Sequence, residues 1–207
     1  LDLAGSRGGA SAPKGNAGTW LIDPYDITIS SSTNNGSWSG GTFTPSGDNA
    51  TISASDINAL LNNGTSVTIS TSGGGTQKGS ISVSAAITKT SGNDVTLTLS
   101  ADYRITIYAA ISSTHNKLHF VADAGRTPIG DGNGRIGQFN VTSTGSISTN
   151  GGNITASGVN NSVTGGYWSG YTCTGATCHG IHVDGDLNAG GGNISLTGLR
   201  RTGGLTR

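Results

Sequence analysis

The sequence predicts an all-β protein, folded as a right-handed parallel β-helix in which short strands stack into a solenoid. Three observations indicate this class: a shortage of apolar residues, a period-two alternation, and internal repetition. Only 32% of the 207 residues are hydrophobic and 36 are glycine, against roughly 45–50% apolar residues in an ordinary domain. A solenoid tolerates this shortage because each turn needs few inward side chains. Disorder is disfavoured because the net charge is +0 and proline numbers only 4.

The first expected strand lies in Thr19–Ser30, TWLIDPYDITIS. Trp20, Leu21 and Ile22 are expected to close one coil, and Asp23–Pro24 to form a corner, since proline fixes φ and donates no hydrogen bond. Ile27 and Ile29 then point inward on the next strand. Further alternating runs, separated by Gly, Asn and Ser, are expected to be strands at 26–30, 66–70, 79–84, 94–100, 104–108 and 117–121.

One short helix is expected at Ala54–Leu61, ASDINALL, in a corner of the solenoid. Ser55 is the expected N-cap, and 62–64, Asn-Asn-Gly, forms the stop signal. No other segment carries a convincing helical pattern.

Internal repetition is the strongest observation. Ile81–Thr90 matches Ile105–Thr114, and Gly145–Gly158 matches Gly185–Gly198. A spacing of about 24 residues is typical of solenoids. In the first pair we expect five inward residues to stack on five others, namely Ile81, Val83, Ile87, Val95 and Leu97 on Ile105, Ile107, Ile111, Leu118 and Phe120.

The whole chain, 1–207, is expected to be a single module and part of a longer protein. It would contain about nine coils of about 22 residues, at the usual spacing between stacked strands. The segment 159–181 interrupts two matching repeats and is expected to leave the solenoid as a loop.

That loop, VNNSVTGGYWSGYTCTGATCHGI, holds the candidate recognition residues Tyr167, Trp168, Tyr171 and His179. Loops on a rigid scaffold often carry binding residues, so a sugar or protein surface is one expected ligand. The alternatives are that the aromatic side chains only anchor the loop, or that His179 binds haem.

Cys173 and Cys178 are separated by four residues in the same loop, and we expect them to form a local disulfide in an oxidising compartment. A zinc half-site with His179 and His182 and a pair of free thiols are the alternatives.

No catalytic residues, cofactor or metal are expected, and the chain is predicted not to be an enzyme. The acidic residues that come nearest to forming a cluster are Asp123, Asp131, Asp184 and Asp186. The run 184–188, DGDLN, begins like a calcium loop but lacks the required Gly and Glu at later positions. The run 131–134, DGNG, is equally incomplete.

Balanced charge argues against a nucleic-acid partner, because phosphate binding depends on clustered Lys and Arg. No apolar run approaches the roughly 20 residues of a membrane span. Neither end of the sequence shows a polar capping helix, so open ends are expected and the protein should self-associate end to end into filaments.

The run GTWLIDPYDITIS at 18–30, followed by the repeats from 41 to 114, resembles the repeat region of filamentous-haemagglutinin-like exoproteins of bacterial two-partner secretion systems. The resemblance covers about residues 1 to 199. It implies export through an outer-membrane transporter, a secreted or cell-surface location, and a role as adhesin or filament component. The Asn-Pro-Asn motifs of that family's secretion domain are absent, so the chain resembles a middle or C-terminal portion.

The expected function is therefore an extracellular structural and adhesive module that stacks end to end and contacts a surface glycan or host protein. A carbohydrate- or ice-binding module is the alternative, because outward threonines recur in the alternating runs. A polysaccharide-active enzyme that uses Asp184 or Asp186 is a third possibility.

Overall fold

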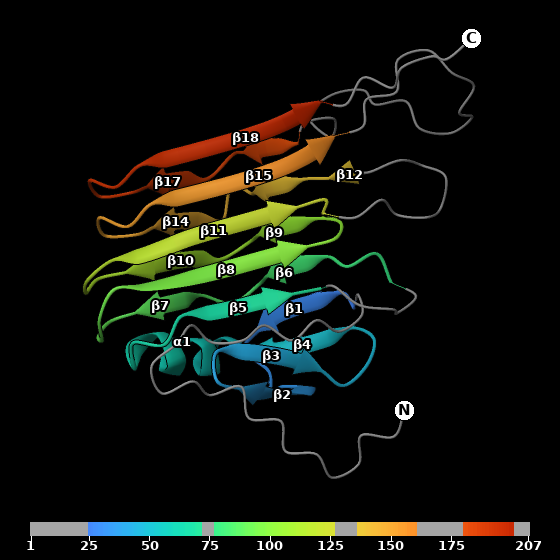
Figure 1. Cartoon of the computed structure of the whole chain (residues 1–207), viewed down its shortest axis with the longest axis horizontal. Coiled ribbons are helices and arrows are strands. Elements are labelled where there is room, and N and C mark those ends of the chain that lie inside the picture. The colour runs from blue at the N-terminus through green and yellow to red at the C-terminus, as the bar shows by residue number, and fades with distance from the viewer. Residues whose placement is uncertain (1–24, 72–76, 127–135, 161–179, 201–207) are drawn as a thin grey trace.

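The computed structural model describes residues 25–71, 77–126, 136–160 and 180–200. Figure 1 shows the described strands stacked along one direction, with a single helix at one end. The elements are β1 Ile27–Ser30, β2 Gly36–Ser39, β3 Thr42–Pro45, β4 Ala50–Ser53, α1 Ala54–Asn62, β5 Val67–Ser70, β6 Ile81–Val83, β7 Ile87–Lys89, β8 Val95–Ala101, β9 Ile105–Ile107, β10 Ala110–Ser113, β11 Leu118–Ala124, β12 Ile136–Gly137, β13 Phe139–Val141, β14 Ser146–Ser148, β15 Ile154–Asn160, β16 Ile181–Val183, β17 Asp186–Asn188 and β18 Ile194–Arg200.

These strands form three sheets. A six-stranded sheet has the order β16-β13-β9-β6-β1-β4, and a four-stranded sheet has the order β17-β14-β10-β7. An eight-stranded sheet runs β12-β15-β11-β8-β5-β3-β2, with β18 also paired to β15. Most pairs are parallel, whereas β2–β3 and β12–β15 are antiparallel.

The predicted stacking of the two early repeats is confirmed. Ile81 pairs with Ile105 and Val83 with Ile107, between β6 and β9. The other three pairs also have the predicted partners: Ile87–Ile111, Val95–Leu118 and Leu97–Phe120. The later repeat behaves in the same way, since Ile147 pairs with Leu187 and Ile154 with Ile194.

The core lies between the three sheets and consists of alternate residues from each strand. Ile27 and Ile29 of β1 are buried, as the alternation predicts, while Thr28 between them is exposed. Ile, Val and Leu dominate these inward positions because branched side chains pack well on a pleated surface. Phe120 and Phe139 are the largest apolar side chains that are fully buried. The small apolar share of the composition is thus concentrated in one continuous core.

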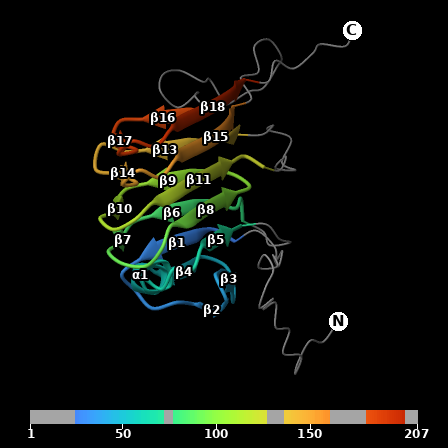
Figure 2. The ribbon, with the colours of Figure 1, turned by 60° about the vertical axis from the view of Figure 1, so that its left-hand side comes forward.

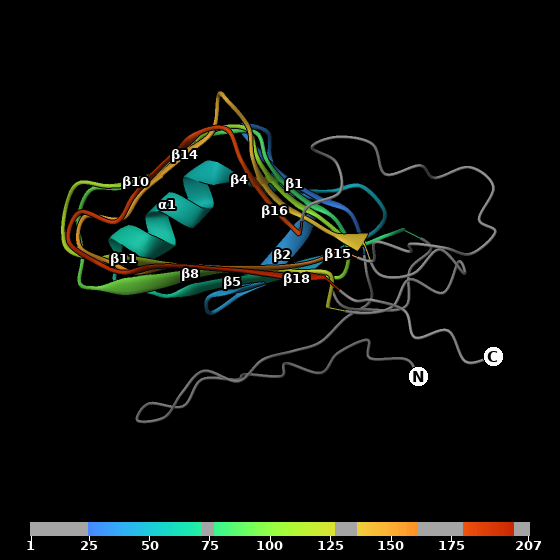
Figure 3. The same ribbon diagram turned by 90° about the horizontal axis from the view of Figure 1, so that it is seen from above.

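The predicted helix exists, but its cap and position differ from the prediction. Ser53, not Ser55, is the N-cap residue, and the helix continues through Asn62. Ala54, Ile57 and Leu61 form its buried face. In Figure 3, α1 lies inside the outline of the sheets and not in a corner of the chain path. Because Figure 1 places α1 beside β3, β4 and β7, the helix covers one end of the core.

The prediction of an all-β, right-handed parallel β-helix of about nine coils is wrong. The described chain forms three open, mostly parallel sheets with one helix packed against one end of the core, which is an α/β-like arrangement. The repeat length is not constant either: successive pairings in the six-stranded sheet join residues 24, 34 and 42 positions apart. Unequal segments between strands therefore replace the regular coil that the first repeat suggests.

The expectation of two open ends does not hold at one end of the stack, where α1 covers the core. We call β2, β3, β4 and α1 the N-terminal end, and β16, β17 and β18 the C-terminal edge. Figure 2 shows them at opposite ends of the stack.

Within the described ranges, no helix is long and apolar enough to cross a membrane.

Candidate functional site

The C-terminal edge is the surface with the clearest capacity for binding. The C-terminal edge is formed by the last strand of each sheet at this end of the stack: β16, β17 and β18. On its inner side, β16 pairs with β13, β17 with β14, and β18 with β15. Among the described residues, no strand pairs with their other side. Unpaired strand edges present backbone donors and acceptors that favour addition of another strand.

The apolar side chains of this edge are uncovered as well. Ile194 is 47% exposed and Leu196 42%, whereas their partners one strand below, Ile154 and Ala156, are 0% and 1% exposed. The edge is therefore a cross-section of the core, in which side chains that every lower strand buries reach the surface. Three further apolar residues of the edge are only partly buried: Ile181, Val183 and Leu187.

A polar cluster lies at one side of the edge. His182 of β16 contacts the Asn140 side chain of β13 through Nδ1, at 2.9 Å from Oδ1. Its Nε2 lies 3.4 Å from Oδ1 of Asp184, a carboxylate that is 55% exposed. The imidazole ring is thus held between the Asn140 amide and the Asp184 carboxylate.

His182 also ends a column of polar side chains on the outer face of the six-stranded sheet. The strand register aligns one such residue from each strand, because successive residues alternate between the two faces. The column consists of Thr51, Thr28, Ser82, Thr106, Asn140 and His182.

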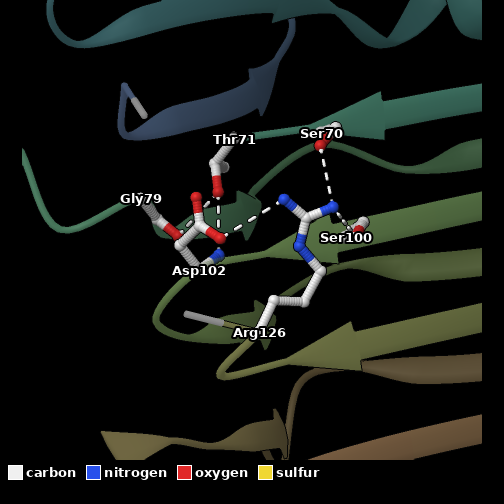
Figure 4. A network of polar contacts seen from close by, with 6 residues as sticks. All are labelled: Ser70, Thr71, Gly79, Ser100, Asp102 and Arg126. Carbon is white, nitrogen blue, oxygen red and sulfur yellow. Dashed lines mark hydrogen bonds and ion pairs between the residues drawn. The ribbon is translucent and has the colours of Figure 1, made fainter. Parts of the chain in front are cut away.

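A buried ionic network ties the interior strands together at another corner, shown in Figure 4. Arg126 lies 3.3 Å from the carboxylate of Asp102, whose side chain is 6% exposed. The same guanidinium donates to Oγ of Ser100 at 3.0 Å and of Ser70 at 3.5 Å. Thr71 accepts from the amide of Asp102 and donates to Gly79 O. The network joins β5, β8 and the end of β11, so we assign it a structural role in holding these strands together.

Lys89 is a second buried ionisable group, at the end of β7. Its side chain is fully buried, and Nζ donates to the carbonyl oxygens of Gly92 and His115. Burial lowers the pKa of Lys89 below its ordinary value, and the carboxylate of Asp94 opposes part of this effect. At the equivalent position of the next strand, Ser113 donates to His115 O and Asn116 O. Lys89 therefore satisfies carbonyl groups at a turn.

The described carboxylates do not converge. Asp123 accepts a hydrogen bond from Ser157 at 2.6 Å on the eight-stranded sheet, Asp184 contacts His182, and Asp186 is exposed on β17. Within the described ranges, no group of three or more His, Cys, Asp or Glu side chains is placed to hold a metal ion. Asp131 lies outside those ranges, and the prediction that the chain is not an enzyme stays a prediction.

The candidate recognition loop cannot be compared with the structure over most of its length. Val159 and Asn160 extend β15, and Ile181 begins β16. The proposed binding residues and the proposed disulfide lie outside the described residues: Tyr167, Trp168, Tyr171, Cys173, Cys178 and His179. The disulfide, its alternatives and the recognition role therefore stay predictions.

Sequence reasoning missed the buried ion pair and the asparagine acceptors. The Asp102–Arg126 pair could not be predicted from a local sequence pattern, because the two residues are 24 positions apart. Recurrent asparagine was interpreted only as turn chemistry, although Asn58 and Asn62, spaced by one helical turn, carried a usable signal.

No protein-family model and no curated protein matches the chain. The resemblance to filamentous-haemagglutinin-like repeats consequently rests on the quoted residues alone.

Proposed function

We propose that this chain is a structural and adhesive module of a secreted bacterial surface protein, and that it associates through its C-terminal edge. The observation that carries the proposal is the exposure of Ile194 and Leu196 on β18, which, like β16 and β17, has no strand paired to its outer side among the described residues. A single exposed apolar residue needs no explanation, but two such residues on the same face of one edge strand offer a site for a further strand.

Burial of these side chains gives a modest driving force. Fully burying a Leu or Ile side chain contributes about 1.5–3 kcal/mol, and Ile194 and Leu196 are a little under half exposed. Each would thus add roughly 1 kcal/mol when another layer covers it. Backbone pairing along β16, β17 and β18 would add to this. Since association also costs translational and rotational freedom, we expect a weak, concentration-dependent contact between isolated copies.

The composition and the resemblance support the surface location. A chain that has little net charge and exposes many Ser and Thr hydroxyls suits an extended scaffold. Export through an outer-membrane transporter, with a surface glycan or host protein as the adhesive target, belongs to the same proposal.

Sedimentation of the full chain over a wide concentration range tests the association. The parent chain should show a mass that rises with concentration, and Leu196→Lys should lose this rise because a charge then occupies the apolar cross-section. Ser195→Lys is the matched control, since Ser195 is an exposed neighbour on the same strand whose side chain points to the other face. A parent chain that stays monomeric, or equal effects of the two lysines, would refute the proposed contact.

A second candidate function is binding of a carbohydrate or ice surface. The observation that favours it is the column of aligned hydroxyl and amide side chains on the six-stranded sheet, which includes Thr28, Thr51 and Ser82. Glycan-array binding or thermal hysteresis that Thr28→Lys abolishes, while Ser37→Lys on β2 preserves it, would favour this candidate over the first.

A further inference from the structure

Asparagine side chains occupy the free edge of β7 at the N-terminal end. Oδ1 of Asn58 accepts the backbone N–H of Thr88 at 2.8 Å. Oδ1 of Asn62 accepts the N–H groups of Thr90 and Ser91 at 2.7 and 3.0 Å. Both asparagines belong to α1, so the helix presents side-chain carbonyls where a neighbouring strand would present backbone carbonyls.

The spacing of these asparagines matches the strand edge. Asn58 and Asn62 are four residues apart on a helix, which is a rise of about 6 Å. Thr88 and Thr90 are two residues apart along the edge, about 6.6 Å in an extended chain. The two repeats are close enough for one helix face to satisfy alternate amides of one strand.

The edge of β4 is occupied in the same way by a different segment. Oδ1 of Asn34 accepts the N–H of Ser53 at 2.7 Å, and Oδ1 of Asn35 accepts the N–H of Thr51. The backbone N–H of Asn35 donates in turn to Thr51 O at 3.1 Å. Two of the three sheets therefore end on asparagine acceptors instead of on open backbone.

The third sheet ends on a short hairpin. β2 turns back on β3 in antiparallel pairing, and Trp38 of β2 packs edge-to-face on Phe43 of β3 with ring centroids 5.3 Å apart. Short edge strands are one way in which proteins discourage further strand addition. At the N-terminal end, two sheets thus end on asparagine acceptors and the third on a short hairpin, in contrast to the C-terminal edge.

We propose that Asn34, Asn35, Asn58 and Asn62 form a stop that prevents strand addition at the N-terminal end. An incoming strand would have to displace carbonyl acceptors that already satisfy the edge amides, and would gain no net hydrogen bond in exchange. Any strand-mediated association of this protein is consequently one-sided. Copies pair at their C-terminal edges and do not continue into a filament. The stop is a property of the N-terminal end alone and holds whether or not the C-terminal edge binds a second copy.

Four versions of the full chain test the stop: the parent and Leu196→Lys, each with and without alanine at all four asparagines. Sedimentation gives their masses, and far-UV circular dichroism confirms their folding. The fourfold alanine variant should exceed the mass of a dimer, because both ends are then open. With Leu196→Lys added it should reach a dimer and no more. Asn63→Ala is the control, since Asn63 is an exposed residue at the end of α1 whose loss should leave the mass unchanged.

The outcomes separate this stop from the proposed function. A monomeric parent whose fourfold variant dimerises would refute association at the C-terminal edge but support the stop. A folded fourfold variant with the mass of its parent in both backgrounds would refute the stop. Should the fourfold variant not fold, the pair Asn58→Ala and Asn62→Ala is measured instead by amide hydrogen exchange. Exchange of the Thr88 and Thr90 amides should then accelerate at least tenfold, and unchanged exchange would refute the stop.

Discussion

Ile154 and Ile194 are paired residues on neighbouring parallel strands, yet Ile154 is fully buried and Ile194 is 47% exposed. The two residues occupy the same position of the same repeat, with the same side chain and the same flanking asparagine. Their difference arises only because another strand covers Ile154 and none of the described strands covers Ile194. Comparing the two residues therefore shows how much burial one further strand layer provides.

The first prediction compares these two residues. Ile154→Ala should lower the free energy of unfolding by about 2–5 kcal/mol, because it leaves a cavity in a packed core. Ile194→Ala in the isolated chain should cost less than about 1 kcal/mol, because much of the side chain is already in water. Urea unfolding of both variants checks the difference. Equal losses would mean that Ile194 is covered in solution.

The second prediction concerns the Arg126 network. Arg126→Met should destabilise the protein by roughly 1–3 kcal/mol, because it leaves the buried carboxylate of Asp102 without its ionic partner. Arg126 is itself partly exposed, which keeps the figure below that of a fully buried pair. Lys117→Met, at an exposed lysine, should be nearly neutral.

A double-mutant cycle provides the control for that network. If Arg126 and Asp102 act as a pair, Asp102→Asn should recover part of the loss in the Arg126→Met background. Strictly additive effects in thermal unfolding would rule out the coupling.

The third prediction follows from the lowered pKa of Lys89. In the folded state the neutral amine is favoured by burial, so the unfolded chain binds more protons between this lowered pKa and the ordinary value for lysine. Stability should therefore rise with pH across that window and level off above it. Lys89→Met removes the titrating group, and its unfolding free energy should lack this rise.

The measurement is the difference between the parent chain and Lys89→Met in urea unfolding from neutral to alkaline pH. This difference cancels the tyrosine and other lysine titrations that both proteins share. Parallel curves at all pH values would show that Lys89 titrates normally.

The fourth prediction concerns close packing at a turn. A Cβ atom on Gly145 would lie 2.2 Å from the carbonyl oxygen of Ile107, which is backbone and cannot rotate away. Gly145→Ala should consequently cost about 1–3 kcal/mol through overpacking. Gly47→Ala is the control, since a Cβ there meets no atom within 4 Å. Similar melting temperatures for the two variants would contradict this account.

The sequence predicted the pairing of the strands better than it predicted the fold class. Alternation identified the inward positions of β6, β8 and β9, because a half-buried strand needs a period of two. The match between 81–90 and 105–114 also gave their register, since a slip by one residue would turn every apolar side chain outward. One regular repeat was then extended to the whole chain, and the later separations of 34 and 42 residues did not follow it.

The candidate site was less accessible to sequence reasoning. The expected binding residues at 167–179 came from a composition anomaly, whereas the C-terminal edge carries residues of ordinary type. Ile194 and Leu196 continue the same pattern as the buried Ile154 and Ala156. No local signal can tell a covered strand from an uncovered one.

The amino-acid sequence alone determined which side chains face the core in the alternating runs and how the strands of the matching repeats pair, because alternation and repetition can be read along the chain. Only the tertiary structure decided that the two ends differ. The acceptors that close β4 and β7 come from asparagines 16 to 30 residues away, and their effect depends on where α1 and the segment around Asn34 lie in space. The exposure of Ile194 likewise depends on the presence of a neighbouring strand, which no property of the residue itself encodes.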